Sequence, residues 1–111
     1  MRCRKHAPIP EEVRRATDLL ERRWTIAILY ASQQGAVRFN EFRQALDGVP
    51  PATLALRLNE LSEAGILRRR LLDGRPPRTE YVLTERGHDL QGVVRAVVRF
   101  SVTRAAVPTD R

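Results

Sequence analysis

The hydrophobic period changes at Gly65, and this change constrains the fold more than any other feature of the chain. Before Gly65, leucines from Leu54 to Leu61 recur every three or four residues, which is the spacing of one helical face. After it, residues 66–72 and 79–83 read as strands of period two that flank an Asp-Gly turn. The sequence therefore predicts a helix that leads directly into a β-hairpin.

Two further helices are expected near the N-terminus, after a flexible arm of residues 1–8. Pro10 is followed by two acidic residues, which is typical of a helix start because acids interact favourably with the positive end of the helix dipole. The segment from Trp24 to Tyr30 is apolar nearly all round. It predicts a second helix, buried at the centre of the fold and ended by Gly35.

A helix-turn-helix unit is expected in the middle of the chain. Residues 37–39 form a short extended piece, and Asn40 suits the N-cap of a third helix that runs through Leu46. Two prolines then close a turn, and a proline in the first helical turn predicts a fourth helix over residues 51–64. The third and fourth helices meet across this tight turn.

A last helix is expected over residues 84–105. Thr84 suits its N-cap, and an apolar stripe runs along it from Leu90 to Val102. A stripe so rich in valine is unfavourable in water. The last helix therefore needs a partner that covers it.

The charge balance indicates an acidic polymer as the partner of the protein. The 111 residues include 20 basic and 13 acidic ones, which gives a net charge of +7. Nucleic acid is the first candidate and an anionic membrane surface the second. Lys5 is the only lysine. The preference for arginine fits bidentate recognition of phosphate or guanine, and it fits a GC-rich genome equally well.

Catalysis and membrane insertion find little support in the sequence. Cys3 is the only cysteine, and His6 and His88 are far apart, so neither an internal disulfide nor a metal site is expected. No apolar run is long enough to cross a bilayer, and the N-terminus lacks the apolar centre of a signal peptide. We expect a cytoplasmic protein that is no enzyme, binds no cofactor and does not enter a membrane.

The order of these elements predicts a winged helix-turn-helix. The expected fold class is α+β and mostly helical, with a single domain over residues 1–111. Residues 51–64 form the recognition helix of this domain, and the basic hairpin tip, residues 72–79, forms its wing. A wing lies along the duplex, where arginines at its tip reach a phosphate or the minor groove.

Two segments carry a family resemblance. The stretch RFNEFRQALDGVPPATLALRLNELSEAGILRRR, followed by PPRTEYVLTERGHDL, resembles the HxlR-type winged-helix regulators, a branch near the MarR-like repressors. The resemblance runs from about Trp24 to Leu90. It implies a homodimeric regulator of transcription, most simply a repressor, in which the first and last helices pair across a two-fold axis. Each wing would then grip one half-site of a pseudo-palindromic operator.

Helical phase indicates which side chains face the DNA. With the leucine stripe inward, Ala52, Leu56 and Asn59 face outward. Asn59 can pair with adenine, Ala52 can touch a thymine methyl, and Thr53 can bond a phosphate or a base edge. The residues expected to contact DNA are Arg38, Arg43, Pro51, Ala52, Thr53, Arg57, Asn59, Arg75 and Arg78.

Several of these assignments have an alternative. Arg57 either contacts a phosphate or pairs with a carboxylate such as Glu41, and Leu56 either touches a thymine methyl or packs under the wing. The family usually has a serine and an arginine where this chain has Pro50 and Ala52. Base readout is therefore expected to be poor, and the alternative function is a winged-helix module that binds an acidic protein.

The resemblance also bears on a candidate redox-active cysteine, an effector site and the dimer interface. Several members of the family sense oxidants through a cysteine followed by proline, but that position falls nearer Ile9-Pro10 here. Cys3 is then either a redox-active thiol or an incidental one. An unidentified small-molecule effector could bind between the helices of the dimer. The residues expected in the dimer interface are Val13, Leu20, Leu90, Val94, Val97 and Val98.

Overall fold

A computed structural model describes residues 6–106 of the chain and contains six helices and one two-stranded sheet in that range. In chain order the elements are α1 (Glu11–Leu20), α2 (Thr25–Gln33), α3 (Phe39–Ala45), α4 (Pro51–Glu63), β1 (Leu67–Leu72), β2 (Arg78–Leu83), α5 (Glu85–His88) and α6 (Gln91–Ala106).

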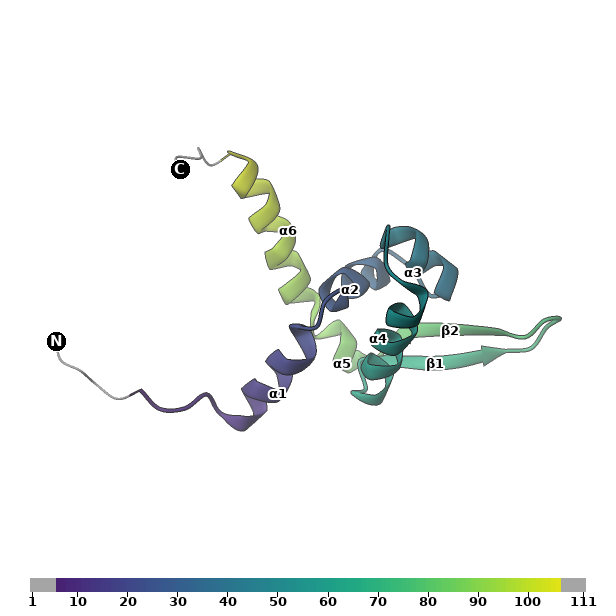
Figure 1. Ribbon diagram of the computed structural model, residues 1–111, viewed down its shortest axis with the longest axis horizontal. Coiled ribbons are helices and arrows are strands. Elements are labelled where there is room, and N and C mark those ends of the chain that lie inside the picture. The colour runs from purple at the N-terminus through teal and green to yellow at the C-terminus, as the bar shows by residue number, and fades with distance from the viewer. Residues whose placement is uncertain (1–5, 107–111) are drawn as a thin grey trace.

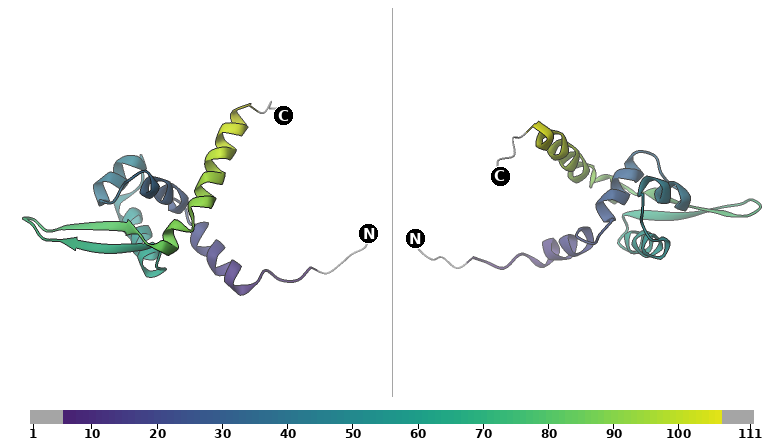
Figure 2. Two further views of the ribbon diagram at one scale, coloured as in Figure 1. Left: turned by 180° about the vertical axis from the view of Figure 1, so that it is seen from behind. Right: turned by 45° about the horizontal axis from the view of Figure 1, so that its top comes forward.

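Helices α2, α3 and α4 form a body from which the other elements extend (Figure 1). The β1–β2 hairpin projects from one side of this body as the wing, whereas α1 and α6 project from the opposite side (Figures 1 and 2). The molecule is consequently elongated, with principal extents of 67 × 36 × 25 Å. The predicted winged helix-turn-helix, α+β and mostly helical, is confirmed.

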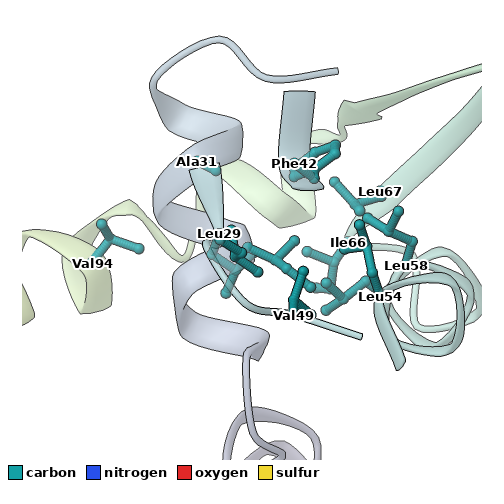
Figure 3. Packing of buried hydrophobic residues seen from close by; sticks show 12 residues of the cluster. Leu29, Ala31, Phe42, Val49, Leu54, Leu58, Ile66, Leu67 and Val94 are labelled. Carbon is teal, nitrogen blue, oxygen red and sulfur yellow. The ribbon is translucent and has the colours of Figure 1, made fainter. Parts of the chain in front are cut away.

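The core lies between the helices of the body and the base of the wing. Leu54, Leu58 and Leu61 of α4 are fully buried, so the leucine stripe faces inward as predicted. They pack in one cluster with Leu29 of α2 and Phe42 of α3 (Figure 3). Burying such side chains stabilises the fold by about 1.5–3 kcal/mol each, and it holds α4 with its opposite face toward solvent.

The wing is the predicted β-hairpin. Its two strands pair antiparallel in continuous register, with Leu67 opposite Leu83 at the base and Leu72 opposite Arg78 toward the tip. Residues 73–77 form the connecting turn, as the Asp-Gly and Pro-Pro pairs indicated. The tip of the hairpin therefore lies well away from the body of helices (Figure 1).

A short extended segment before α3 adds to the wing. The expected piece at 37–39 is a single bridge, Arg38 opposite Glu80, beside a 2.7 Å hydrogen bond from the Tyr81 amide to the Val37 carbonyl. The bridge joins the start of the helix-turn-helix unit to β2 and so fixes the direction of the wing.

The start of α3 differs from the prediction. Asn40 does not cap this helix, because Arg38 occupies the N-cap position and Asn40 lies in the first turn. The carboxylate of Glu41 reaches back instead, and its Oε1 atom accepts the amides of Val37 (2.8 Å) and Arg38 (3.0 Å). These two backbone hydrogen bonds lower the pKa of Glu41 from its ordinary 4.5.

The helix predicted over residues 84–105 is broken in two, into α5 and α6. Thr84 caps the first piece as expected, because its hydroxyl accepts the Gly87 amide at 3.0 Å. The same hydroxyl donates to the Gly65 carbonyl at 2.5 Å. These bonds tie the start of α5 to the residue after the α4 C-cap. Helix α5 is a single turn, and a turn at residues 89–90 separates it from α6.

Candidate nucleic-acid interface

The solvent face of α4 presents the side chains that helical phase predicted. Pro51 occupies the first helical turn, where its missing amide has no partner to lose. Pro51, Ala52 and Asn59 are exposed, and Thr53 is half-buried on the flank. Asn59 also donates a long hydrogen bond, 3.4 Å, to Glu63 one turn later. The recognition helix thus offers few polar groups to base edges.

Leu56 lies in the middle of this face and is 51% exposed. Of its two expected roles, packing under the wing does not fit the single chain, because the wing leaves half of the Leu56 side chain open to solvent. An apolar side chain therefore sits at the centre of the surface that would meet DNA.

A hollow of about 680 Å³ separates α3 from the start of α4. Arg43 on α3 and Pro51 on α4 both line it, together with Asn40 and Gln44. Two residues expected to contact DNA from different helices are thus brought to one concave surface. Its rim is polar and includes one cationic and one acidic residue, Arg43 and Asp47, both exposed.

A second hollow, of about 300 Å³, lies between the start of α3 and the wing. Arg38 and Arg78, forty residues apart in the sequence, line it together with Asn40 and Gln44. Because Asn40 and Gln44 border both hollows, the three arginines at positions 38, 43 and 78 belong to one continuous surface.

The wing adds cations that differ in their availability. Alternation places Arg68 and Arg70 on one face of β1 and Arg69 on the other. Arg70 is bound locally, since its Nη2 atom is 2.8 Å from Glu80 Oε1. Arg75, in the turn, is exposed at the tip. The structure thus identifies Arg70 as the locally paired member of the arginine run.

Arg57 is turned away from the outward face of α4. Its Nε atom donates to the Arg23 carbonyl at 2.8 Å, and its Nη1 atom is 3.3 Å from Glu60 Oε1. The side chain is only 15% exposed. An ion pair was one of its two expected roles, but the partner is Glu60 and not Glu41, because Glu41 caps α3.

Glu60 and Arg22 are residues that the sequence analysis missed. Glu60 accepts from Arg57 on its own helix and from Arg22 Nη1 at 3.3 Å in the segment after α1. The spacing of Arg57 and Glu60 by three residues on a predicted helix is a signal that could have revealed their pairing. The contact with Arg22 has no such signal.

The residues expected in a dimer interface fall into three groups, which are exposed, half-buried and buried. Val13, Val97 and Val98 are exposed, by 47%, 45% and 40% respectively. Leu20 and Leu90 are half-buried and line a common hollow of about 200 Å³ between α1 and the end of α5, within one chain.

Val94 corrects the expectation for the last helix. It is only 4% exposed, because it packs against α2 inside the same chain, across that helix from the rest of the core (Figure 3). Little of its surface remains for a second copy to cover. The valine stripe therefore divides into a core residue and exposed positions one turn later.

Four expectations concern features other than the DNA interface. Cys3 lies outside the residues that the structure describes. Within residues 6–106, no group of His, Cys, Asp and Glu side chains is arranged to hold a metal ion. A largely apolar hollow of about 670 Å³ lies among α2, α3 and α6, with Tyr30 and Val97 in its lining. Over the same range, no helix has the length and apolarity needed to cross a bilayer.

A family model and individual known proteins both match this chain, and all of them are of the helix-turn-helix kind. The family model described as HxlR-like helix-turn-helix matches residues 19–106. A regulator of Synechocystis, the HTH-type transcriptional regulator sll1512, is 38% identical over 77% of this chain. The HTH-type transcriptional regulator YvaP of Bacillus subtilis is 31% identical over 78% of this chain and 81% of its own length.

The chain spans 63% of the length of the Synechocystis relative. Among solved structures, the reduced form of the transcriptional regulator YodB from B. subtilis superposes with a TM-score of 0.73 at 30% identity. That match covers 85% of this chain and 92% of YodB. The similarity thus extends through the recognition helix, the wing and the last helix.

Proposed function

Because the chain belongs to the HxlR-like helix-turn-helix family, whose relatives are transcriptional regulators and not enzymes, we propose that it binds operator DNA as a homodimer. Each protomer places the N-terminal end of α4 in the major groove and its wing along the neighbouring backbone. Occupying a promoter in this way makes the protein a repressor. Its site of action is the DNA, so we expect it in the cytoplasm.

The continuous surface around Asn40 carries this proposal. It joins Arg43, beside the start of α4, to Arg38 and Arg78 at the wing. Cations on a surface that begins beside a helix N-terminus can contact the phosphates that flank a major groove. With a net charge of +7, the chain supplies the long-range attraction that such contacts need.

The composition of the outward face of α4 decides how much of the DNA affinity comes from base contacts and how much from backbone contacts. Leu56, Ala52 and Pro51 offer no hydrogen bonds to base edges, so α4 reads bases through few groups, chiefly Thr53 and Asn59. Backbone contacts from Arg38, Arg43, Arg75 and Arg78 would then supply most of the affinity. Arg57 does not belong to this set, because its guanidinium is bound inside the protomer.

A homodimer would cover the apolar surface of the projecting helices. None of the residues of α1 is buried, although Val13 and Leu20 give the helix a pronounced apolar side. On α6, Val97 and Val98 are exposed. A second copy that packs against both helices places two recognition helices about one turn of DNA apart, roughly 34–36 Å. The hollow lined by Tyr30 and Val97 is large enough for a small-molecule effector.

Selection of bound duplexes from a random library by the purified protein tests the function. The proposal predicts an enriched pseudo-palindrome that is bound at least about a thousandfold more tightly than scrambled DNA at physiological salt. Sizing chromatography with light scattering on the same sample should give the mass of two chains. Binding that shows no enriched sequence and vanishes at physiological salt would contradict operator recognition.

One observation favours a second candidate, a module that binds an acidic protein. Leu56 is exposed at the centre of the face where DNA would lie, and exposed apolar side chains mark protein interfaces. Leu56→Ala separates the two functions. It should leave DNA binding within about threefold, whereas a protein partner held by this face would lose much more.

A further inference from the structure

We propose that Arg57 is a positioning residue, which locks the recognition helix α4 to the linker between α1 and α2. The linker consists of residues 21–24 and joins the projecting helix α1 to the body. The inference rests on the proposed function in one respect, because it takes α4 as the helix that meets DNA. The lock itself is a property of the free protein.

The guanidinium of Arg57 has two partners within the chain. Its Nε atom donates to the Arg23 carbonyl in the linker at 2.8 Å, and its Nη1 atom lies 3.3 Å from Glu60 Oε1. The planar fork of arginine suits two such acceptors at once, whereas a lysine ammonium has no comparable fixed geometry. One side chain thus joins α4 to the linker backbone.

Glu60 makes the second attachment between the same two segments. Its Oε1 atom pairs with Arg57, and its Oε2 atom accepts from Arg22 Nη1 at 3.3 Å. Its side chain is 20% exposed, so water screens the pair less than it would on an open surface. Two consecutive linker residues, Arg22 and Arg23, are therefore held by one turn of α4.

The linker has the strained backbone of a segment that its surroundings hold in place. Trp24 has a φ of +81°, a left-handed conformation that is unfavourable for a bulky residue. Such conformations persist where surrounding contacts enforce them. Arg23 lies over the Trp24 ring, with its guanidinium carbon 4.8 Å from the centroid. The contacts of α4 with Arg22 and Arg23 supply that enforcement next to the strained residue.

The lock has a consequence for DNA recognition. In a dimer held together through α1, the angle between α1 and α4 sets the separation of the two recognition helices. An operator with two half-sites requires one particular separation of the recognition helices, whereas nonspecific DNA can be bound at many separations. Loosening the lock should therefore weaken operator binding while it spares binding to scrambled DNA.

Glu60→Gln tests the lock, because the lock and simple electrostatics predict opposite changes in operator affinity. Removing a negative charge from the DNA-binding helix should strengthen binding to any duplex if electrostatics alone acts. The lock predicts the opposite for the operator, about a tenfold loss, with scrambled DNA bound equally well or better. Glu63→Gln is the matched control on the same helix, because Glu63 makes no ion pair within residues 6–106 and a glutamine oxygen can still accept its hydrogen bond from Asn59. It should not weaken operator binding.

Arg57→Lys separates positioning from phosphate contact. A phosphate contact would survive in lysine, so operator affinity and the salt dependence of binding would change little. The lock predicts that Arg57→Lys loses operator affinity about tenfold, like Glu60→Gln, with an unchanged salt slope. Because Arg57 and Glu60 also pair with each other, the double variant should lose less operator affinity than the two single losses multiplied together.

Trp24 fluorescence reports the lock without DNA. Trp24 is the only tryptophan in the chain, and it adjoins Arg23. In the free protein, Glu60→Gln and Arg57→Lys should shift its emission to the red and raise its quenching by acrylamide, whereas Glu63→Gln should do neither. Circular dichroism checks that all three variants remain folded.

Two outcomes would overturn the lock. Unchanged Trp24 emission in folded Glu60→Gln and Arg57→Lys would show that the linker does not depend on α4. Tighter operator binding by Glu60→Gln would show that charge alone governs its effect. A wrong proposed function would give a different result from a wrong lock. The wild-type protein would then select no operator, but the variants would still show the shift in Trp24 fluorescence.

Discussion

Arg70 and Glu80 lie opposite each other in the wing, and the Arg70 Nη2 atom donates to Glu80 Oε1 over 2.8 Å. Glu80 is largely buried, so this pair occupies one arginine of the run at positions 68–70. Arg75 and Arg78 make no ion pair within residues 6–106. The wing therefore contains both a structural arginine and arginines available to an anion.

This difference predicts the salt dependence of DNA binding. Arg75→Ala and Arg78→Ala should weaken binding to operator and scrambled DNA alike, and each should reduce the slope of log affinity against log salt by about one. Arg70→Ala should leave the slope unchanged. Fluorescence anisotropy titrations over a range of salt concentrations measure all three. Unchanged slopes for Arg75→Ala and Arg78→Ala would show that the wing tip does not contact DNA.

Val94 and Val97, three residues apart on α6, should respond differently to aspartate. Val97→Asp places a charge on an exposed surface, so the chain should stay folded but elute as a monomer in sizing chromatography. Val94→Asp buries a charge against α2, and it should unfold the chain by removing about 3 kcal/mol or more of stability. Circular dichroism distinguishes the two results. A folded dimer of Val97→Asp would place the dimer interface elsewhere.

Glu41 should contribute a defined part of the acid sensitivity of the fold. The amides of Val37 and Arg38 lower its pKa in the folded chain, so its contribution to stability is present above the ordinary value of 4.5. That contribution is lost as the pH falls through the lowered folded value. Glu41→Gln should therefore show a flatter dependence of the urea midpoint on pH below 4.5 than the wild type.

Glu12→Gln, in the exposed first turn of α1, is the control for that titration. It should keep the acid dependence of the wild-type protein. Equal curves for the wild type and Glu41→Gln would show that the carboxylate does not hold the start of α3 in solution.

Gly87 and Gly92 form a matched pair for alanine substitution. A Cβ atom at Gly87 would lie 2.3 Å from the Ile66 carbonyl oxygen and 2.8 Å from Leu83 Cδ2, so Gly87→Ala should cost about 3 kcal/mol. A Cβ atom at Gly92 meets nothing within 4 Å. Gly92→Ala should instead stabilise α6 by about 0.5–1 kcal/mol. Thermal unfolding measures both, and a stable Gly87→Ala variant would contradict the tight contact between α5 and the end of α4.

Local signals in the sequence were sufficient for most secondary structure. The leucine stripe of α4, its end at Gly65 and the Asp-Gly turn of the wing each depend on residues within one element. They are therefore visible without knowledge of the fold. The break between α5 and α6 was missed because the contact of Gly87 with Ile66 lies between elements, and because the apolar stripe that predicts the last helix begins only at Leu90, beside the break.

The candidate site was predictable to the extent that helical phase determines it. Ala52, Leu56 and Asn59 face outward because the stripe on the other side of α4 is buried. The extended piece at 37–39 was predicted, but not that it brings Arg38 to the same hollow as Arg78. The burial of Val94 and the orientation of Arg57 toward the linker could not be predicted from helical phase, because each depends on a neighbour in another element.

The sequence by itself determined the order of the elements, the basic wing and the inward face of the recognition helix. Spacing along the chain and net charge are sufficient for these, since they act within a helix, a hairpin or the whole molecule. Only the tertiary structure decided that Arg57 faces the linker, that Glu60 pairs with Arg22 from 38 residues away, and that Val94 belongs to the core. Such partners are selected by packing between distant segments, and packing exists only once the chain has folded.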